Sequence, residues 1–268
     1  MYWEGDEGLA TLLAELADGA GPWPGLDEPG RRPIRLVLAP DDARFDSLTR
    51  GRLPEWGEGA AFPGSNTILL KATGDSRTLQ RVLRHELAHL ALHEAVRRVP
   101  RWFDEGYAAH AAGEWDARDA LTVNWAVLRG VRPSLAELDR HLRGASAADA
   151  GAAYALAMTA VVLLERIGGT RGLGALLSTL ETTSDFDAAL RLTHQITLGQ
   201  FEERWYKELR GRYGWMLLVT SVSVFWAVAA IVLVALWSQR RARDRMRRLA
   251  LEQSPVPEPE HEDGILDA

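Results

Sequence analysis

An uncharged run near the C-terminus constrains this 268-residue chain more than any other feature. Residues 213–239 include no charged side chain, and the centre of the run, residues 215–237, reads WMLLVTSVSVFWAVAAIVLVALW. As a helix this centre would be roughly 35 Å long at about 1.5 Å per residue, enough to cross a bilayer with some tilt. Its terminal aromatic residues suit the headgroup boundary. Core helices of this length without a polar face are rare, so the run predicts one transmembrane helix over residues 213–238.

The charges that flank the run predict its orientation. Six arginines follow it within residues 240–248, opposed only by Asp244, whereas four basic residues precede it within residues 204–212. The positive-inside rule therefore places the C-terminus in the cytoplasm and the larger N-terminal part outside it. Residues 1–21 show neither a basic n-region nor a continuous apolar segment, so this placement rests on the arginine excess alone.

Composition excludes several classes of protein. Apolar residues make up 47% and charged residues 25% of the chain, which is typical of a globular protein. The chain has no cysteine, which excludes a disulfide framework, a thiol nucleophile and a zinc site built from thiolates. A formal net charge of -6 argues against nucleic acid as the partner.

The remainder of the chain predicts an α+β domain. Residues 34–38 and 67–71 are short β-type runs, and residues 50–66 between them have the composition of a loop. An amphipathic helix follows from Ser76 to Val99 and ends at Pro100, and a short helix is expected at residues 102–112. Residues 113–213 are helical in pattern. The expected organisation begins with an N-terminal helix and linker (1–29). A domain follows over residues 30–212, with an α/β part to about 115 and a helical part from about 116. After it come the transmembrane helix (213–238) and an arginine-rich, then acidic and disordered tail (239–268).

The chemistry is concentrated in the sequence His85-Glu86-Leu87-Ala88-His89, an HExxH motif inside the strongest predicted helix. The i, i+4 spacing places both imidazoles on one face, one turn apart, as two ligands of a single Zn²⁺ require. Glu86 lies beside that face and is positioned to act as the general base toward water at the metal. Two solvated surface histidines are the alternative, but the apolar neighbours of the motif make that costly.

A catalytic zinc site needs a third protein ligand. The position six residues after the second histidine is Ala95, which cannot supply one. Pro100 allows the chain to reverse, so Asp104 or Glu105 on the next helix can return to the metal. His93, one further turn along the helix, is interpreted as partly solvated, with a ligand role as the alternative. His110 and Glu114 are interpreted as surface residues. The tryptophans, including Trp56, Trp115 and Trp125, are interpreted as core and interface anchors.

The segments HELAHLALHE and PRWFDEGYAAH together resemble the gluzincin peptidases, and specifically the bacterial peptidase MA-like family. The resemblance implies that Glu105 is the third zinc ligand beside His85 and His89, and that GSNTILLKA, which includes Thr67–Lys71, is an edge strand that pairs with substrate. It also assigns to Tyr154 a hydrogen bond to the oxyanion, with a core tyrosine as the alternative. Thermolysin-like enzymes carry an Asp four residues after the ligand Glu, and here that position is Ala109.

The sequence therefore predicts a single-pass membrane protein with a zinc metallopeptidase domain. Its fold would be a zincin-like small sheet with the HExxH helix, then a helical subdomain and one C-terminal transmembrane helix. The expected site consists of the metal ligands His85, His89 and Glu105 with Glu86 and Tyr154 as catalytic residues, acting on a peptide or protein substrate. The alternative function is a catalytically silent envelope scaffold that retains the zinc site.

Overall fold

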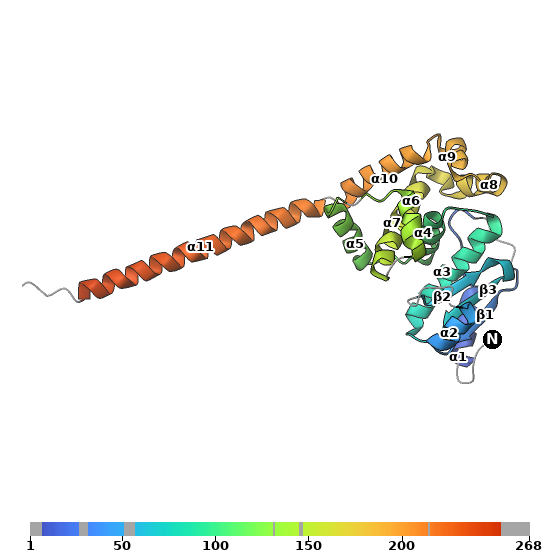
Figure 1. Ribbon diagram of the computed structural model, residues 1–268, viewed down its shortest axis with the longest axis horizontal. Helices are drawn as coiled ribbons and strands as arrows, with labels where there is room; N and C mark the ends of the chain where they lie inside the picture. Colours follow the sequence, from blue (N-terminus) through green and yellow to red (C-terminus); the bar gives the residue numbers. More distant parts are fainter. Residues whose placement is uncertain are drawn as a thin grey trace, which may run out of the picture. The chain divides into compact units, whose positions relative to one another are not determined.

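A computed structural model describes residues 7–26, 32–50, 57–130, 132–144, 147–213 and 215–252 (Figure 1). The chain divides into two compact units, residues 1–215 and 216–268. The first unit is mostly helical and contains a small mixed sheet, which confirms the α+β class.

The sheet of the described residues has three strands: β1 (Arg35–Ala39), β2 (Gly59–Phe62) and β3 (Thr67–Lys71). Their order is β1-β3-β2, with β1 parallel and β2 antiparallel to β3. The expectation that Thr67–Lys71 is an edge strand is therefore wrong, because β3 has a partner on each side. The expectation of a loop over residues 50–66 is also wrong at Gly59–Phe62, which is a strand. These residues include no β-branched side chain, and the strand forms through backbone pairing with β3.

The two faces of the sheet belong to different parts of the core. Val37 and Leu69 pack with Phe45 of α2 (Asp42–Thr49) on one side. Their neighbours in the strands, Leu38 and Leu70, belong to the main core with α3 (Ser76–Ala95). This division follows from the alternation of side chains along a strand, and it places α3 against the face opposite α2.

Helices α3 and α4 (Arg101–Ala112) carry the motif segments. Asp75 caps α3 by accepting the N–H groups of Arg77 and Thr78, and α3 ends at Ala95, four residues before the expected end. Pro100 precedes α4, which packs against both α3 and α7 (Ala147–Ile167). A Cβ on Gly106 would lie 2.5 Å from the carbonyl oxygen of Ala157, so glycine is required where α4 meets α7.

Further helices complete the first unit and confirm the helical pattern of residues 113–213. Short 3-10 turns cover Pro63–Ser65 and Gly169–Arg171. The helices are α1 (Glu7–Asp18), α5 (Ala117–Leu128), α6 (Leu135–Gly144), α8 (Gly174–Thr182), α9 (Phe186–His194) and α10 (Leu198–Tyr213).

The described residues of the second unit belong to one long helix, α11 (Trp215–Glu252), so the helix continues past residue 238 through the arginine-rich segment. Large apolar side chains described on α11 are exposed, among them Phe225, Trp226, Ile231, Leu233 and Trp237. The expected span lies partly outside the described side chains. Among those that are described, Ala150–Ile167 of α7 is long and apolar enough to cross a membrane, but more than half of it is buried as a core helix. Residues 1–6 and the tail at 253–268 lie outside the described residues.

Candidate metal centre

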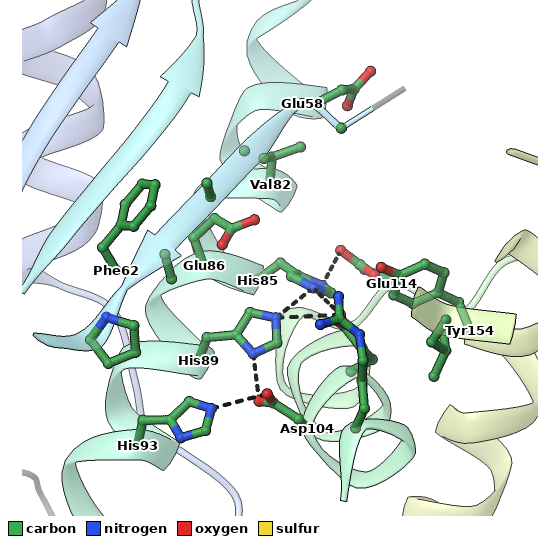
Figure 2. Close-up of a pocket in the computed structure, with 18 residues that line it drawn as sticks. Glu58, Phe62, Val82, His85, Glu86, His89, His93, Asp104, Glu114 and Tyr154 are labelled. Carbon is green, nitrogen blue, oxygen red and sulfur yellow. Dashed lines mark hydrogen bonds and ion pairs between the residues drawn. The ribbon is translucent and has the colours of Figure 1, made fainter. Parts of the chain in front are cut away.

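Helix α3 presents His85 and His89 on one face toward α4 (Figure 2). Their Nε2 atoms are 3.1 Å apart. Glu105 of α4 places its Oε2 3.6 Å from Nε2 of His85 and 3.5 Å from Nε2 of His89. The three side chains therefore form a group whose ligand atoms could hold one metal ion.

A carboxylate contacts the Nδ1 atom of each imidazole ring and so fixes the ring. Nδ1 of His85 lies 3.1 Å from Oε1 of Glu114, and Nδ1 of His89 lies 2.7 Å from Oδ1 of Asp104. An ionised carboxylate only accepts hydrogen bonds, so each Nδ1 donates, and the lone pair of the neutral ring is at Nε2. The rings are thus oriented so that Nε2 can act as a metal ligand.

Asp104 also contacts a third histidine. Its second oxygen, Oδ2, is 3.0 Å from Nε2 of His93. His89, His93 and Asp104 consequently form a second group with ligand atoms close enough to bind a metal. Asp104 and Glu114 are thus the carboxylates that orient the two rings, and Ala109 contributes none.

Glu114 and His110, expected to be surface residues, are half-buried and paired with other side chains. His110 pairs with Glu165 at 2.8 Å, and Glu114 reaches the site from just beyond the end of α4. Gly113 ends α4 with a positive φ of 70°, a conformation that favours glycine, and this turn directs Glu114 back toward α3. Its position depends on tertiary packing, and nothing local in the sequence distinguishes it from a solvated glutamate.

Glu105 is buried and uses its two oxygens differently. Oε1 forms an ion pair with Arg101 at 2.9 Å, one turn earlier on α4, while Oε2 faces the two imidazoles. Only Oε2 of Glu105 is therefore presented to the imidazole pair.

The carboxylates determine the charge of the metal-free site. Burial opposes a charge on His89, but Asp104 and Glu105 outweigh it and raise its pKa to about 10. Burial likewise opposes ionisation of Asp104, yet His89 and His93 hold its pKa at about 2. The pKa of His85 is raised well above its usual value, because Glu114 and Glu105 outweigh the effect of burial. This anionic surrounding favours a cation between the rings.

Glu86 faces the same cavity, which has a volume of about 460 Å³ and is also lined by Gly59–Phe62 of β2. Burial raises the pKa of Glu86, and the two imidazoles only partly offset this. A Cβ on Gly59 would lie 2.8 Å from Oε1 of Glu86, so β2 approaches this carboxylate closely because residue 59 is glycine.

Tyr154 lies in the second turn of α7, with its ring centroid 6.4 Å from that of His85. Its pKa is raised far above the usual value, first by burial and then by the nearby Glu105 carboxylate. The hydroxyl is therefore protonated at neutral pH and can donate a hydrogen bond.

The donor set fits a zinc ion. Tetrahedral ligands at about 2.0–2.1 Å from zinc are separated from one another by roughly 3.3 Å. The observed separations are 3.1, 3.5 and 3.6 Å, and the donors are two imidazole nitrogens and one carboxylate oxygen. Nitrogen and oxygen ligands of this kind are typical of catalytic zinc.

Comparison with protein families agrees with this geometry. A model of the Peptidase MA superfamily matches residues 46–211, which include β2, β3, the motif helix and most of the helical part. The chain belongs to the Peptidase MA superfamily. This membership confirms the family that the motif segments resemble. A search of curated proteins found no match to the chain.

Proposed function

We propose that this member of the Peptidase MA superfamily is a membrane-anchored, zinc-dependent peptidase. The observation that carries the proposal is the convergence of three ligand atoms from His85, His89 and Glu105 beside the buried carboxylate of Glu86. A metal-ligand set next to a general base in one cavity is the minimum equipment for hydrolysis of a peptide bond.

His85, His89 and Glu105 would hold the zinc ion. The alternative third ligand, Asp104, already uses one oxygen for Nδ1 of His89 and the other for His93, whereas Oε2 of Glu105 faces both Nε2 atoms. When bound, zinc supplies Lewis-acid polarisation and lowers the pKa of water at the site.

Glu86 would move the proton during hydrolysis. Its carboxylate accepts a proton from the attacking water and later gives it to the departing amine nitrogen. A pKa raised by burial suits this exchange, because the group must hold the proton between the two transfers. Tyr154, kept neutral by its surroundings, would donate a hydrogen bond to the carbonyl oxygen as negative charge develops on it.

Strand β2 would bind the substrate backbone. Among the described strands, β2 has β3 on one side only, and its residues line the cavity on the other. The N–H of Lys71 donates to the carbonyl of Glu58, and the alternation of an antiparallel ladder then turns the backbone groups of Gly59 and Ala61 away from β3. An extended peptide could add to this edge as a further strand.

The membrane anchor would be the N-terminal part of α11. Support comes from the uncharged run at residues 213–239 and from the exposed apolar side chains described on this helix, such as Phe225 and Leu233. The arginine excess after the run supports a cytoplasmic C-terminus and an extracytoplasmic peptidase domain.

Substitution of Glu86 by glutamine tests the peptidase. The full chain in detergent should contain one zinc ion and cleave peptides in a chelator-sensitive manner. Glu86→Gln should retain the zinc and lose about 10²–10⁴-fold in activity, since it removes a general base but no ligand. Glu94→Gln, on the same helix and paired with Arg32, is the control and should change neither property. Tyr154→Phe should reduce activity by about 10–10³-fold if its hydroxyl stabilises the oxyanion.

The zinc content separates the two functions. One outcome is a wild type that binds zinc and yet cleaves no peptide faster than Glu86→Gln does. In that case the peptidase proposal fails and the scaffold function takes its place. If zinc persists in Glu105→Ala but is lost in Asp104→Ala, Asp104 is the third ligand.

A further inference from the structure

Helix α5 exposes an apolar stripe that the proposed active site does not use. Leu121 and Trp125, one turn apart, are each 57% exposed. Arg118 and Arg129 lie on the same face at the two ends of the stripe, and the guanidinium of Arg129 is 5.0 Å from the centroid of the Trp125 ring. Trp125, expected to be a core or interface anchor, is therefore not part of the core.

The opposite face of α5 holds the helix firmly in the first unit. Val123 and Asn124 are buried, and α5 packs against α7 and α10. A capping box of Asp116 and Asp119 begins the helix, so these two carboxylates are engaged with backbone N–H groups. The exposed stripe is therefore presented on an ordered helix.

The start of α5 adjoins the place where the chain leaves the first unit. The rings of Trp115 and Tyr213 are 6.1 Å apart, and Tyr213 is the last residue of α10. Figure 1 shows α5 beside the last turns of α10. In the sequence, Trp215 begins the apolar helix only two residues after Tyr213.

We propose that the Arg118–Leu121–Trp125–Arg129 face of α5 docks on the headgroup region of the bilayer that the chain's own apolar segment spans. The proposal rests on the membrane anchor proposed above. Leu121 and Trp125 are four and eight residues from Ala117, where α5 begins, which is roughly 6 and 12 Å along the helix. The patch is therefore within reach of the surface that the chain enters beside Tyr213.

The chemistry of the patch matches a lipid interface. Tryptophan favours the headgroup boundary because its ring is apolar and its N–H is polar. Exposed arginines attract the phosphates of anionic lipids, and Arg210 and Arg212 at the end of α10 add two more cations near the same point of the chain. A leucine and a tryptophan flanked by cations is the pattern of an interfacial helix face.

The test uses single cysteines, since the chain has none of its own. Leu121→Cys is labelled with a nitroxide in the full chain, reconstituted in phosphatidylcholine vesicles with a minority of phosphatidylglycerol. Collision rates are measured with oxygen, which concentrates in lipid, and with chromium oxalate, which stays in water. Leu192→Cys on α9, an apolar position that is 69% exposed, is the matched control, and Val228→Cys on α11 reports the anchor.

The label at 121 should show an oxygen-to-chromium-oxalate ratio several-fold above that at 192, and the ratio should fall toward the control value in the Arg118→Ser/Arg129→Ser background. If 121 matches 192 while 228 is in lipid, docking is refuted and the anchor stands. If 228 is in water, the anchor itself is refuted. If 121 is shielded from both reagents and shows nitroxide–nitroxide broadening, a second copy covers the face and the lipid proposal is overturned.

Discussion

Asp104 acts on two imidazoles at once, and at the scale of single residues it is the most informative side chain outside the HExxH motif. It accepts from Nδ1 of His89 and contacts Nε2 of His93. Asp104→Asn should retain the fold but lower zinc affinity by about 10–100-fold, because the ring of His89 loses the carboxylate that orients it. Competition with a chromophoric chelator measures this. An unchanged affinity would show that the His89 ring is held without Asp104.

The metal-free site should release protons when zinc binds. In the folded, metal-free protein the pKa of His89 is raised to about 10, so its ring remains charged below that pH, and at pH 7 a metal ion must displace the proton. Zinc affinity should therefore rise with pH. Binding of one zinc ion at pH 7 should release at least about one proton. Calorimetry in two buffers of different ionisation enthalpy measures the number. Identical heats in both buffers would contradict the assigned charge state.

Residues whose role depends on local spacing are visible in the sequence, and the others are not. His85 and His89 come together because a helix brings i and i+4 to one face. Asp104 is apparent as a candidate ligand but not as the partner of His89. Glu114 reaches His85 because α4 packs on α3 and a left-handed turn at Gly113 follows. The glycine marks the turn in the sequence, but the packing of α4 on α3 has no local signature.

At the scale of elements, the contact of α4 with α7 determines how far Glu105 is buried, because the next residue, Gly106, lies at that contact. Gly106→Ala should destabilise the protein by about 1–3 kcal/mol, because its Cβ would meet the backbone of Ala157 and force the helices apart. Gly151→Ala, in α7 with open space around it, should be neutral or stabilise by up to about 1 kcal/mol. Denaturant midpoints at constant slope measure both. Equal effects of the two substitutions would refute the steric argument.

The same scale shows why one strand was not predicted. Helices α3 and α4 are recognisable from their apolar periodicity and from Pro100 between them. Strand β2 is formed from Gly-Ala-Ala-Phe, which has little intrinsic β preference and is defined by its pairing with β3. The strand beside the candidate site therefore becomes visible only in three dimensions.

At the scale of the whole molecule, the arginine excess after residue 239 predicts a defined topology. Protease added to intact cells should digest the domain that contains residues 46–211 and leave a C-terminal tag protected. Permeabilised cells, in which the tag becomes accessible, provide the control. Protection of the domain together with loss of the tag would reverse the orientation.

All three proposed zinc ligands lie on one helical hairpin, within residues 85–105, and so does the carboxylate that orients His89. Only residues 96–100 connect its helices, so the entropy lost on closing it is small and its contacts are local. The hairpin can therefore form early, before the C-terminal helices have been synthesised, and an ion that binds it then contributes its binding free energy to folding. The ligands that zinc needs are therefore present before the C-terminal helices exist, so loading can begin while the chain is still being synthesised.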